Sequence, residues 1–168
     1  MKEPSEGVGT AQPSRRWDEL GAVGGFEVLP FGFLVFVAGT LLIANAWGVV
    51  DGKIAASAGA REAARAYVES TASSGAGALA DAETAAADAV AGHGRDPDRM
   101  EVSSEGRLAF ERCAPATFVV TYRVPTISLP WIGGLGDGFI VTSARHSEVV
   151  DPFRDDVANA PDIGVVSC

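Results

Sequence analysis

The sequence is poor in positive charge. Its 168 residues carry 13 Lys and Arg against 22 Asp and Glu, and the net charge is −9. A protein that binds nucleic acid needs clustered Lys and Arg to neutralise phosphates, so this balance argues against nucleic acid as a partner. The length allows one modest domain together with a membrane segment, and is too short for two full hydrophobic cores.

The sequence also lacks the motifs of common catalytic and metal sites. It has no P-loop, no GxSxG nucleophile motif and no CxxC pair, and His93 and His146 have no partners at metal-ligand spacing. We therefore expect a protein that is not an enzyme, with no catalytic residues, no metal, no cofactor and no small-molecule substrate.

Cysteine is scarce as well, since only Cys113 and Cys168 occur. Two cysteines exclude a Cys-rich zinc site and leave either one disulfide or two free thiols. A Cys113–Cys168 bridge would close a loop of about 55 residues and, in the chain-entropy account, stabilise the folded state by roughly 4 kcal/mol.

What the sequence does contain is a long run without charge. No charged residue occurs from Val28 to Val50, between Glu27 and Asp51. These 23 residues would form a helix of roughly 34 Å, longer than the ~30 Å hydrocarbon core of a bilayer. We predict a transmembrane helix over 27–50, and expect Pro30 to mark its first turn.

Two other interpretations of this run stay open. The first is a buried core helix, although core helices rarely remain uncharged over such a length. The second is a cleaved secretory signal, for which "ANA" at 44–46 could supply the small-residue cleavage site. Against a signal, the apolar region is longer than the usual ~7–15 residues and follows a polar leader.

The regions on either side of the run differ in character. Residues 1–26 are rich in Pro, Gly, Ser and charge, which predicts a disordered cytoplasmic leader. Residues 51–168 hold both cysteines, which suits an oxidising exterior, whereas the basic residues flanking the run are nearly balanced. We expect a single-pass protein of the cell membrane, with its N-terminus in the cytoplasm and a disulfide-bonded domain outside.

The pattern after Asp51 predicts an α+β fold. Nothing interrupts the helix before "STASSGAG" at 70–77, and an Ala-rich segment closed by Gly92 predicts a second helix. Alternating apolar residues then predict a small antiparallel sheet of three or four strands. The expected elements are a helix over 78–92 and strands over 100–105, 107–112, 116–124 and 139–150.

Small residues recur at every fourth position of the long helix and form a stripe on one face. A second helix backbone can approach such a stripe closely, which predicts packing against another subunit. Because Ala is also the best helix former, part of the pattern can reflect propensity alone. We expect Gly48→Leu or Gly52→Leu to abolish association and to leave the domain folded. The stripe consists of Thr40, Ala44, Gly48, Gly52, Ala56, Ala60 and Ala64.

Three segments resemble the TadE/TadG-like family of tight-adherence (Flp-type) pilus assembly proteins, which are often called pseudopilins. They are "FEVLPFGFLVF" at the start of the apolar run, "AREAARAYVE" after it and "FIVTSARHSEVV" near the end. The resemblance covers about residues 21–154. It implies an inner-membrane protein with an extracytoplasmic domain that acts in pilus biogenesis or secretion, with related subunits or copies of itself as partners.

The resemblance also gives Glu27 a possible role. In pilins and pseudopilins a membrane peptidase cuts after a glycine, and a nearby Glu enters the apolar core of the filament, where the new α-amino group of a neighbour can pair with it. Cleavage after Gly21, Gly24 or Gly25 would make Glu27 the sixth, third or second residue, whereas the usual position is about the fifth. Alternatively, Glu27 lies among lipid headgroups or stabilises the N-terminus of the helix.

A different class of function stays open beside pilus assembly. The chain could be a membrane-anchored binding or envelope protein unrelated to pili, in which the helix is only an anchor and the stripe tolerates bulky residues. The segment "LPWIGGLG" (129–136) either binds a partner or packs on the chain's own sheet.

Overall fold

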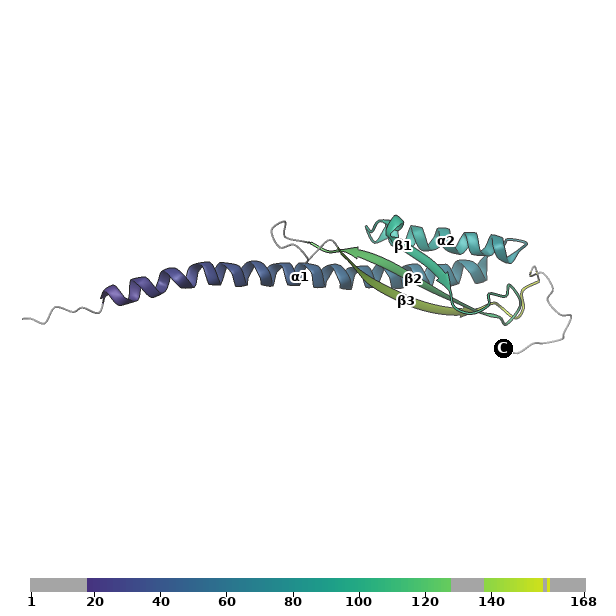
Figure 1. Ribbon diagram of the computed structural model, residues 1–168. Helices are drawn as coiled ribbons and strands as arrows, with labels where there is room; N and C mark the ends of the chain where they lie inside the picture. Colours follow the sequence, from purple (N-terminus) through teal and green to yellow (C-terminus); the bar gives the residue numbers. More distant parts are fainter. Residues whose placement is uncertain (1–17, 128–137, 156, 158–168) are drawn as a thin grey trace, which may run out of the picture. The chain divides into compact units, whose positions relative to one another are not determined.

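The computed structural model describes residues 18–127, 138–155 and 157, and only the backbone of residues 18–27. The described residues form an α+β fold, as the sequence predicts, with a three-stranded antiparallel sheet in the order β1-β2-β3. The elements, drawn in Figure 1, are α1 (Asp18–Glu69), α2 (Gly75–Gly92), the short 3-10 helix η1 (Pro97–Arg99), β1 (Met100–Ser104), β2 (Pro115–Pro125) and β3 (Phe139–Val149).

Helix α1 is longer than the sequence predicts at its N-terminal end. It begins at Asp18, inside the expected leader, and Pro30 lies in its interior instead of marking its start. A proline removes one backbone donor and only biases the preceding residue away from the helical conformation, so the apolar residues before it can remain helical. The predicted boundary at 26 is therefore not a helix boundary.

The chain divides into two compact units, Met1–Leu41 and Leu42–Cys168, and α1 crosses the division. The second unit, called the domain below, begins within the apolar run and before the boundary predicted at residue 51. Its first contacts explain this position, because Asn45 bonds the backbone of Ile127 and Gly48 lies against Val124.

Helix α2 is defined by its two caps. The hydroxyl of Ser74 accepts a hydrogen bond from the N–H of Gly77 at 3.2 Å, which satisfies one free donor of the first turn. At the other end Gly94, with φ +69°, donates to Ala91 while Arg95 donates to Val90. This is a Schellman ending, so Gly94 and not Gly92 supplies the left-handed residue that stops the helix.

Strand β2 is the centre of the sheet and follows the predicted alternation. Its even-numbered residues from Ala116 to Val124 are buried, and its odd-numbered residues are half-buried or exposed. Val120 pairs with Val102 of β1 on one side and with Ala144 of β3 on the other. Because opposed residues point to the same face, one face of the sheet is buried and the other faces outward.

The strand predicted at 107–112 does not form. After β1 the chain turns at Gly106, which has φ +82°, and residues 107–112 are irregular. The sequence predicts that this segment forms a hairpin with 100–105 around Gly106, but in the structure β1 pairs with β2. The segment instead buries Phe110 next to Tyr67, with the two ring centroids 5.4 Å apart.

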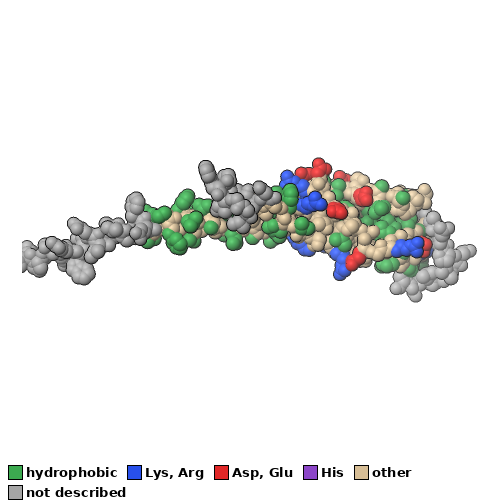
Figure 2. Space-filling model, viewed as in Figure 1, with side chains coloured by type: hydrophobic (Ala, Val, Ile, Leu, Met, Phe, Trp, Pro, Cys, Tyr) green, Lys and Arg blue, Asp and Glu red, His purple; other side chains and the backbone are tan. Residues whose placement is uncertain are grey.

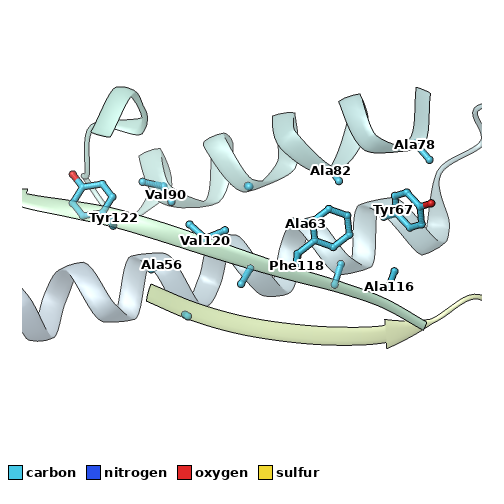
Figure 3. Close-up of a cluster of buried hydrophobic side chains, with 14 of the residues drawn as sticks. Ala56, Ala63, Tyr67, Ala78, Ala82, Val90, Ala116, Phe118, Val120 and Tyr122 are labelled. Carbon is cyan, nitrogen blue, oxygen red and sulfur yellow. The ribbon is translucent and has the colours of Figure 1, made fainter. Parts of the chain in front are cut away.

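The core depends on how closely α1 approaches its neighbours. The buried side of α1 carries only Gly and Ala until Tyr67, and α2 contributes Ala at three of its four buried positions. A Cβ built on Gly59 would lie 3.2 Å from Val90 of α2 and 3.6 Å from Val120 of β2. Figure 3 shows Ala56, Ala63 and Val120 pointing into the space that α1, α2 and β2 enclose. We call this buried face of α1 the seam; it consists of Gly52, Ala55, Ala56, Gly59, Ala60, Ala63 and Ala64.

The close packing of the seam predicts that replacing one of its glycines by alanine destabilises the protein, whereas the same change in an open helix stabilises it. In an open helix Gly→Ala stabilises by about 0.5–1 kcal/mol. At Gly52 the new Cβ would lie 2.6 Å from Cγ2 of Val124, so we expect Gly52→Ala to lower the free energy of unfolding by about 1–3 kcal/mol. Gly92→Ala is the control, because nothing lies within 4 Å of its Cβ position. Urea unfolding of both variants, followed by circular dichroism, would contradict the close packing if Gly52→Ala were as stable as the control.

Tyr67 predicts a dependence on alkaline pH. Burial between Phe110 and Phe118 raises the pKa of Tyr67 above its ordinary value of 10.0. The stabilisation is present below the pKa of the unfolded chain and is lost as the pH rises from there through the higher folded pKa. We expect the free energy of unfolding to fall above about pH 10, and to fall less steeply in Tyr67→Phe. Absorbance titration at 295 nm would contradict this if Tyr67 ionised at its ordinary pKa.

Candidate functional site

Most residues of α1 between Val28 and Phe36 are large, apolar and exposed. They belong to the one described helix that is long and apolar enough to cross a membrane, and no residue of its apolar window is buried by the protein. A core helix would be buried, so this observation argues against that interpretation of the run. The exposed residues, each more than half accessible, are Val28, Leu29, Phe31, Phe33, Leu34, Val35 and Phe36.

Charge is distributed quite differently over the domain. On the face drawn in Figure 2, acidic and basic side chains gather over the domain, and none occurs on the uncharged run. Exposed apolar surface of this extent is unusual for a protein in water and marks a surface that contacts lipid or another protein. The apolar face of α1 is therefore the candidate functional surface.

The predicted stripe divides between two environments. Thr40 is exposed, and its hydroxyl donates to the carbonyl of Phe36 at 2.9 Å, so this polar group is satisfied within the helix. Ala44 and Gly48 are half-buried. The remaining four members, Gly52, Ala56, Ala60 and Ala64, are buried within the domain.

The buried part of the stripe packs on the chain itself. It forms part of the seam, so β2 and α2 already make the close approach that small residues permit. A helix of another subunit could reach this part only if the domain opened. Gly52→Leu would therefore also disturb the core, because even a Cβ would meet Val124 at 2.6 Å, and it cannot separate association from the stability of the domain. Subunit packing stays a prediction for Thr40, Ala44 and Gly48.

The residues predicted for processing lie in the first turns of α1. The backbone of Gly21, Gly24, Gly25 and Glu27 is helical, and their side chains lie outside the description. The helix begins at Asp18, nine residues before Glu27. Cleavage and the pairing of Glu27 with an amine stay predictions.

Asn45 joins the apolar run to the sheet. Its amide oxygen accepts from the N–H of Ile127 at 2.8 Å, and its amide nitrogen donates to the carbonyl of Ile127 at 3.3 Å. The side chain thus pairs with the backbone just beyond β2 as a neighbouring strand would. Sequence reasoning missed this role, although Asn45 is the only amide side chain in the run and was therefore a visible signal.

Charged contacts fix the helix where the run ends. Arg95, placed by the Schellman ending of α2, donates to Asp51 from Nε at 2.7 Å and also from its terminal nitrogen. Lys53 donates to the backbone carbonyl of Ser143 on β3. The first two charges after the run therefore hold α2 and β3 to α1.

Arg154 attaches the C-terminal end of α1 to the segment that follows β3. Its two terminal nitrogens donate to the carbonyls of Val68 and Ser70, where the helix ends, and its guanidinium lies 5.2 Å from the ring centroid of Phe110. The free carbonyls of the last turn thus gain partners from the chain that follows β3. The resemblance extended to this residue, but no pattern in the sequence indicated its contact.

Of the two cysteines, only Cys113 lies among the described residues. Cys113 adopts φ +62° and donates from its backbone to the carbonyl of Val150 at 3.0 Å. It is not a free thiol. Cys168 lies outside the described residues, as does the segment 129–136, so the Cys113–Cys168 bridge and the role of that loop stay predictions.

The next question is whether the described residues contain a cluster of side chains that could bind a metal ion. They contain no group of three or more His, Cys, Asp or Glu side chains that could hold a metal ion. His146 lies 3.4 Å from Glu148 at the surface, and His93 is exposed. Every buried side-chain nitrogen or oxygen in this part of the chain has a hydrogen-bond partner, so no unpaired polar group points toward a missing ligand.

Comparison with known proteins identifies no relative. No family model, curated protein or solved structure matches the chain.

The contacts of Arg154 predict that its replacement lowers the stability of the domain. Arg154→Ala leaves the carbonyls of Val68 and Ser70 without their charged donor, and we expect the free energy of unfolding to fall by about 1.5–3 kcal/mol. The matched control is Arg145→Ala, which removes an exposed ion pair with Glu105 and should change stability by less than about 1 kcal/mol. Equal melting temperatures for the two variants would show that Arg154 does not fasten the end of α1.

Proposed function

We propose that the chain is a non-enzymatic, single-pass membrane protein that acts as a pseudopilin-like component of a Tad (Flp-type) pilus assembly or secretion system. Its N-terminus lies in the cytoplasm and its domain outside the cell membrane. It acts through contacts of its long helix with other pilin-like subunits or with copies of itself, while the domain presents a surface outside.

The observation that carries this proposal is the change of environment along one helix. Between Val28 and Phe36, α1 exposes large apolar side chains, and the seam of the same helix is buried in the core of an α+β domain. A simple anchor needs no continuity between its membrane helix and its domain. In this chain one continuous helix supplies both the apolar segment and the central helix of the domain, as a pilin-like subunit requires.

The uncovered part of the stripe supports self-association. Thr40 is exposed and has its hydroxyl satisfied by Phe36, so it can contact a second helix in lipid without leaving an unpaired donor. Built Cβ atoms at Gly32 and Gly39 meet nothing within 4 Å. Small residues therefore remain accessible on the apolar part of α1, where a neighbouring helix backbone can come close.

A membrane-anchored binding protein is the second candidate, and one observation favours it. Most of the small residues that suggested subunit packing serve the chain's own core, so the accessible stripe is shorter than the sequence predicted. In this alternative the apolar part of α1 contacts only lipid.

Photo-crosslinking in the native membrane separates the two candidates. A photoreactive residue at Thr40 should capture one discrete partner, identified by mass spectrometry as a second copy or a pilin-like subunit with an N-terminal apolar helix. The control position is Asp88, which is exposed on α2 and outside the apolar run. Crosslinks to lipid alone at Thr40, together with a monomeric protein, would contradict assembly and favour the anchor.

The state of the N-terminus is a separate prediction. If the chain is processed as a prepilin, intact mass and N-terminal sequencing of protein from its native membrane should give a new terminus at Ala22, Gly25 or Phe26. A terminus near Trp47 would mean a signal peptide and a released domain, which contradicts the proposal. An uncut chain would remove the amine that pairs with Glu27 and leave assembly to helix packing.

A further inference from the structure

Large apolar side chains remain exposed at the end of the domain that adjoins the apolar run. All are more than half accessible, between 51% and 72%. They come from three separate stretches of the chain that the packing brings to one level. We call these residues the apolar belt: Trp47, Val50 and Ile54 of α1, Ile127 after β2, and Phe139 and Val141 of β3.

The residues of the apolar belt lie close to one another along the domain, because α1, the end of β2 and the start of β3 are in contact at this point. Gly48 and Gly52 of α1 contact Val124, and Val124 pairs with Ile140 of β3. Phe139 and Val141 are the neighbours of Ile140, and Ile127 is bonded to Asn45. The α1 residues and the sheet residues of the belt therefore adjoin the same short stretch of the domain.

The side chains of the apolar belt point in different directions. Trp47, Val50 and Ile54 are three and four residues apart and share a face of α1 that is not the one on which Gly48 and Gly52 meet the sheet. Phe139 and Val141 point to the outer face of the sheet, opposite to the inward side of Val124. A single partner helix would cover one of these surfaces, whereas a fluid apolar phase covers them all.

Charged residues limit the belt on the side of the domain. Arg123 is directly opposite Val141 and lies 3.9 Å from Glu101 of β1. Lys53 reaches the carbonyl of Ser143, two residues further along β3. From Phe139 to Val141 the strand advances ~7 Å, so the apolar zone is about as deep as the ~5–10 Å to which interfacial segments enter a bilayer.

We propose that the apolar belt lies in the interface of the lipid bilayer, so that the end of the domain is partly immersed. This inference rests on the proposed membrane anchor and deepens it. The length of the helix supports it, because the 17 residues from Val28 to Ala44 span only roughly 25 Å, short of the ~30 Å core. The bilayer must then also cover the turns from Asn45 to Val50, to which the sheet is already attached.

Immersion gives each residue at the boundary a suitable environment. Trp and Phe are favoured at the level of the headgroups, and Lys53 and Arg123 are placed where cationic side chains meet lipid phosphates. The domain is then held against the membrane by contacts on several sides, and its orientation relative to the membrane is fixed by more than the single helix.

Fluorescence quenching by brominated lipid tests the inference on the full-length chain. In a background in which Trp17, Trp47 and Trp131 are Phe, one new Trp is placed at Phe139, at the other end of β3, or in the apolar run. The protein is reconstituted into phosphatidylcholine–phosphatidylglycerol vesicles with bromine on the acyl chains, and iodide in the buffer probes exposure to water. The three variants are Phe139→Trp, Val149→Trp and Phe36→Trp.

Val149 is a matched control for Phe139. It is exposed to 51% against 59% for Phe139, lies on the same face of β3 and is ten residues away, ~33 Å along the strand. We expect brominated lipid to reduce the fluorescence of Phe139→Trp and Phe36→Trp at least two-fold and to leave Val149→Trp unchanged. Iodide should quench only Val149→Trp.

The other outcomes overturn the inference in distinguishable ways. Quenching of Phe36→Trp by lipid with Phe139→Trp quenched by iodide would show an anchored chain whose domain stays in water. Absence of lipid quenching at Phe36→Trp would refute the membrane anchor itself. Shielding of Phe139→Trp from both quenchers would mean that protein, and not lipid, covers the belt.

Discussion

The close contact between the seam of α1 and strand β2 is the interaction on which the rest of the fold depends. Side chains no larger than a methyl group let the helix backbone approach Val120 and Val124, and the same seam accepts Val90 from α2. The domain buries few large side chains: the rings of Phe110 and Phe118 lie beside Tyr67, and Tyr122 is buried near Gly52. Much of its cohesion must therefore come from dispersion contacts between closely spaced backbones and small side chains, which a single methyl group can disrupt.

This constraint assigns different tasks to the two parts of α1. Within the domain, the seam of α1 is covered by the chain's own sheet and second helix, so this face is not available for contact with other subunits. The part before the domain is apolar and uncovered, and any function in assembly must use it. Between them, Asn45, Asp51 and Lys53 attach the helix to the chain beyond β2, to the loop after α2 and to β3.

The sequence was sufficient to predict the main helices and strands, but not to predict which elements pack against each other. The uncharged run, the alternation in 116–124 and the Ala-rich second helix predicted α1, β2 and α2 because each pattern repeats with the period of its element. The four-residue recurrence of small residues correctly indicated close packing, but a period does not say which surface is approached, and here it is the chain's own sheet. The strand predicted at 107–112 was wrong because β1 pairs with β2 and the segment instead buries Phe110 beside Tyr67, a contact between residues far apart in the sequence. The contacts of Asn45 and Arg154 join residues more than 80 positions apart, which no local pattern reveals.

Hydrogen exchange of the full chain in lipid nanodiscs, followed through increasing denaturant, tests the central claim that one helix serves both the bilayer and the domain. We predict that the amides of residues 52–67 exchange together with those of β2, as one cooperative unit. Those of residues 28–41 should stay protected after that unit has opened, because lipid and not the domain shields them. Loss of protection at 28–41 together with the domain would show that protein contacts cover the apolar part. Faster exchange at 52–67 than in β2 would show that α1 is not the spine of the fold.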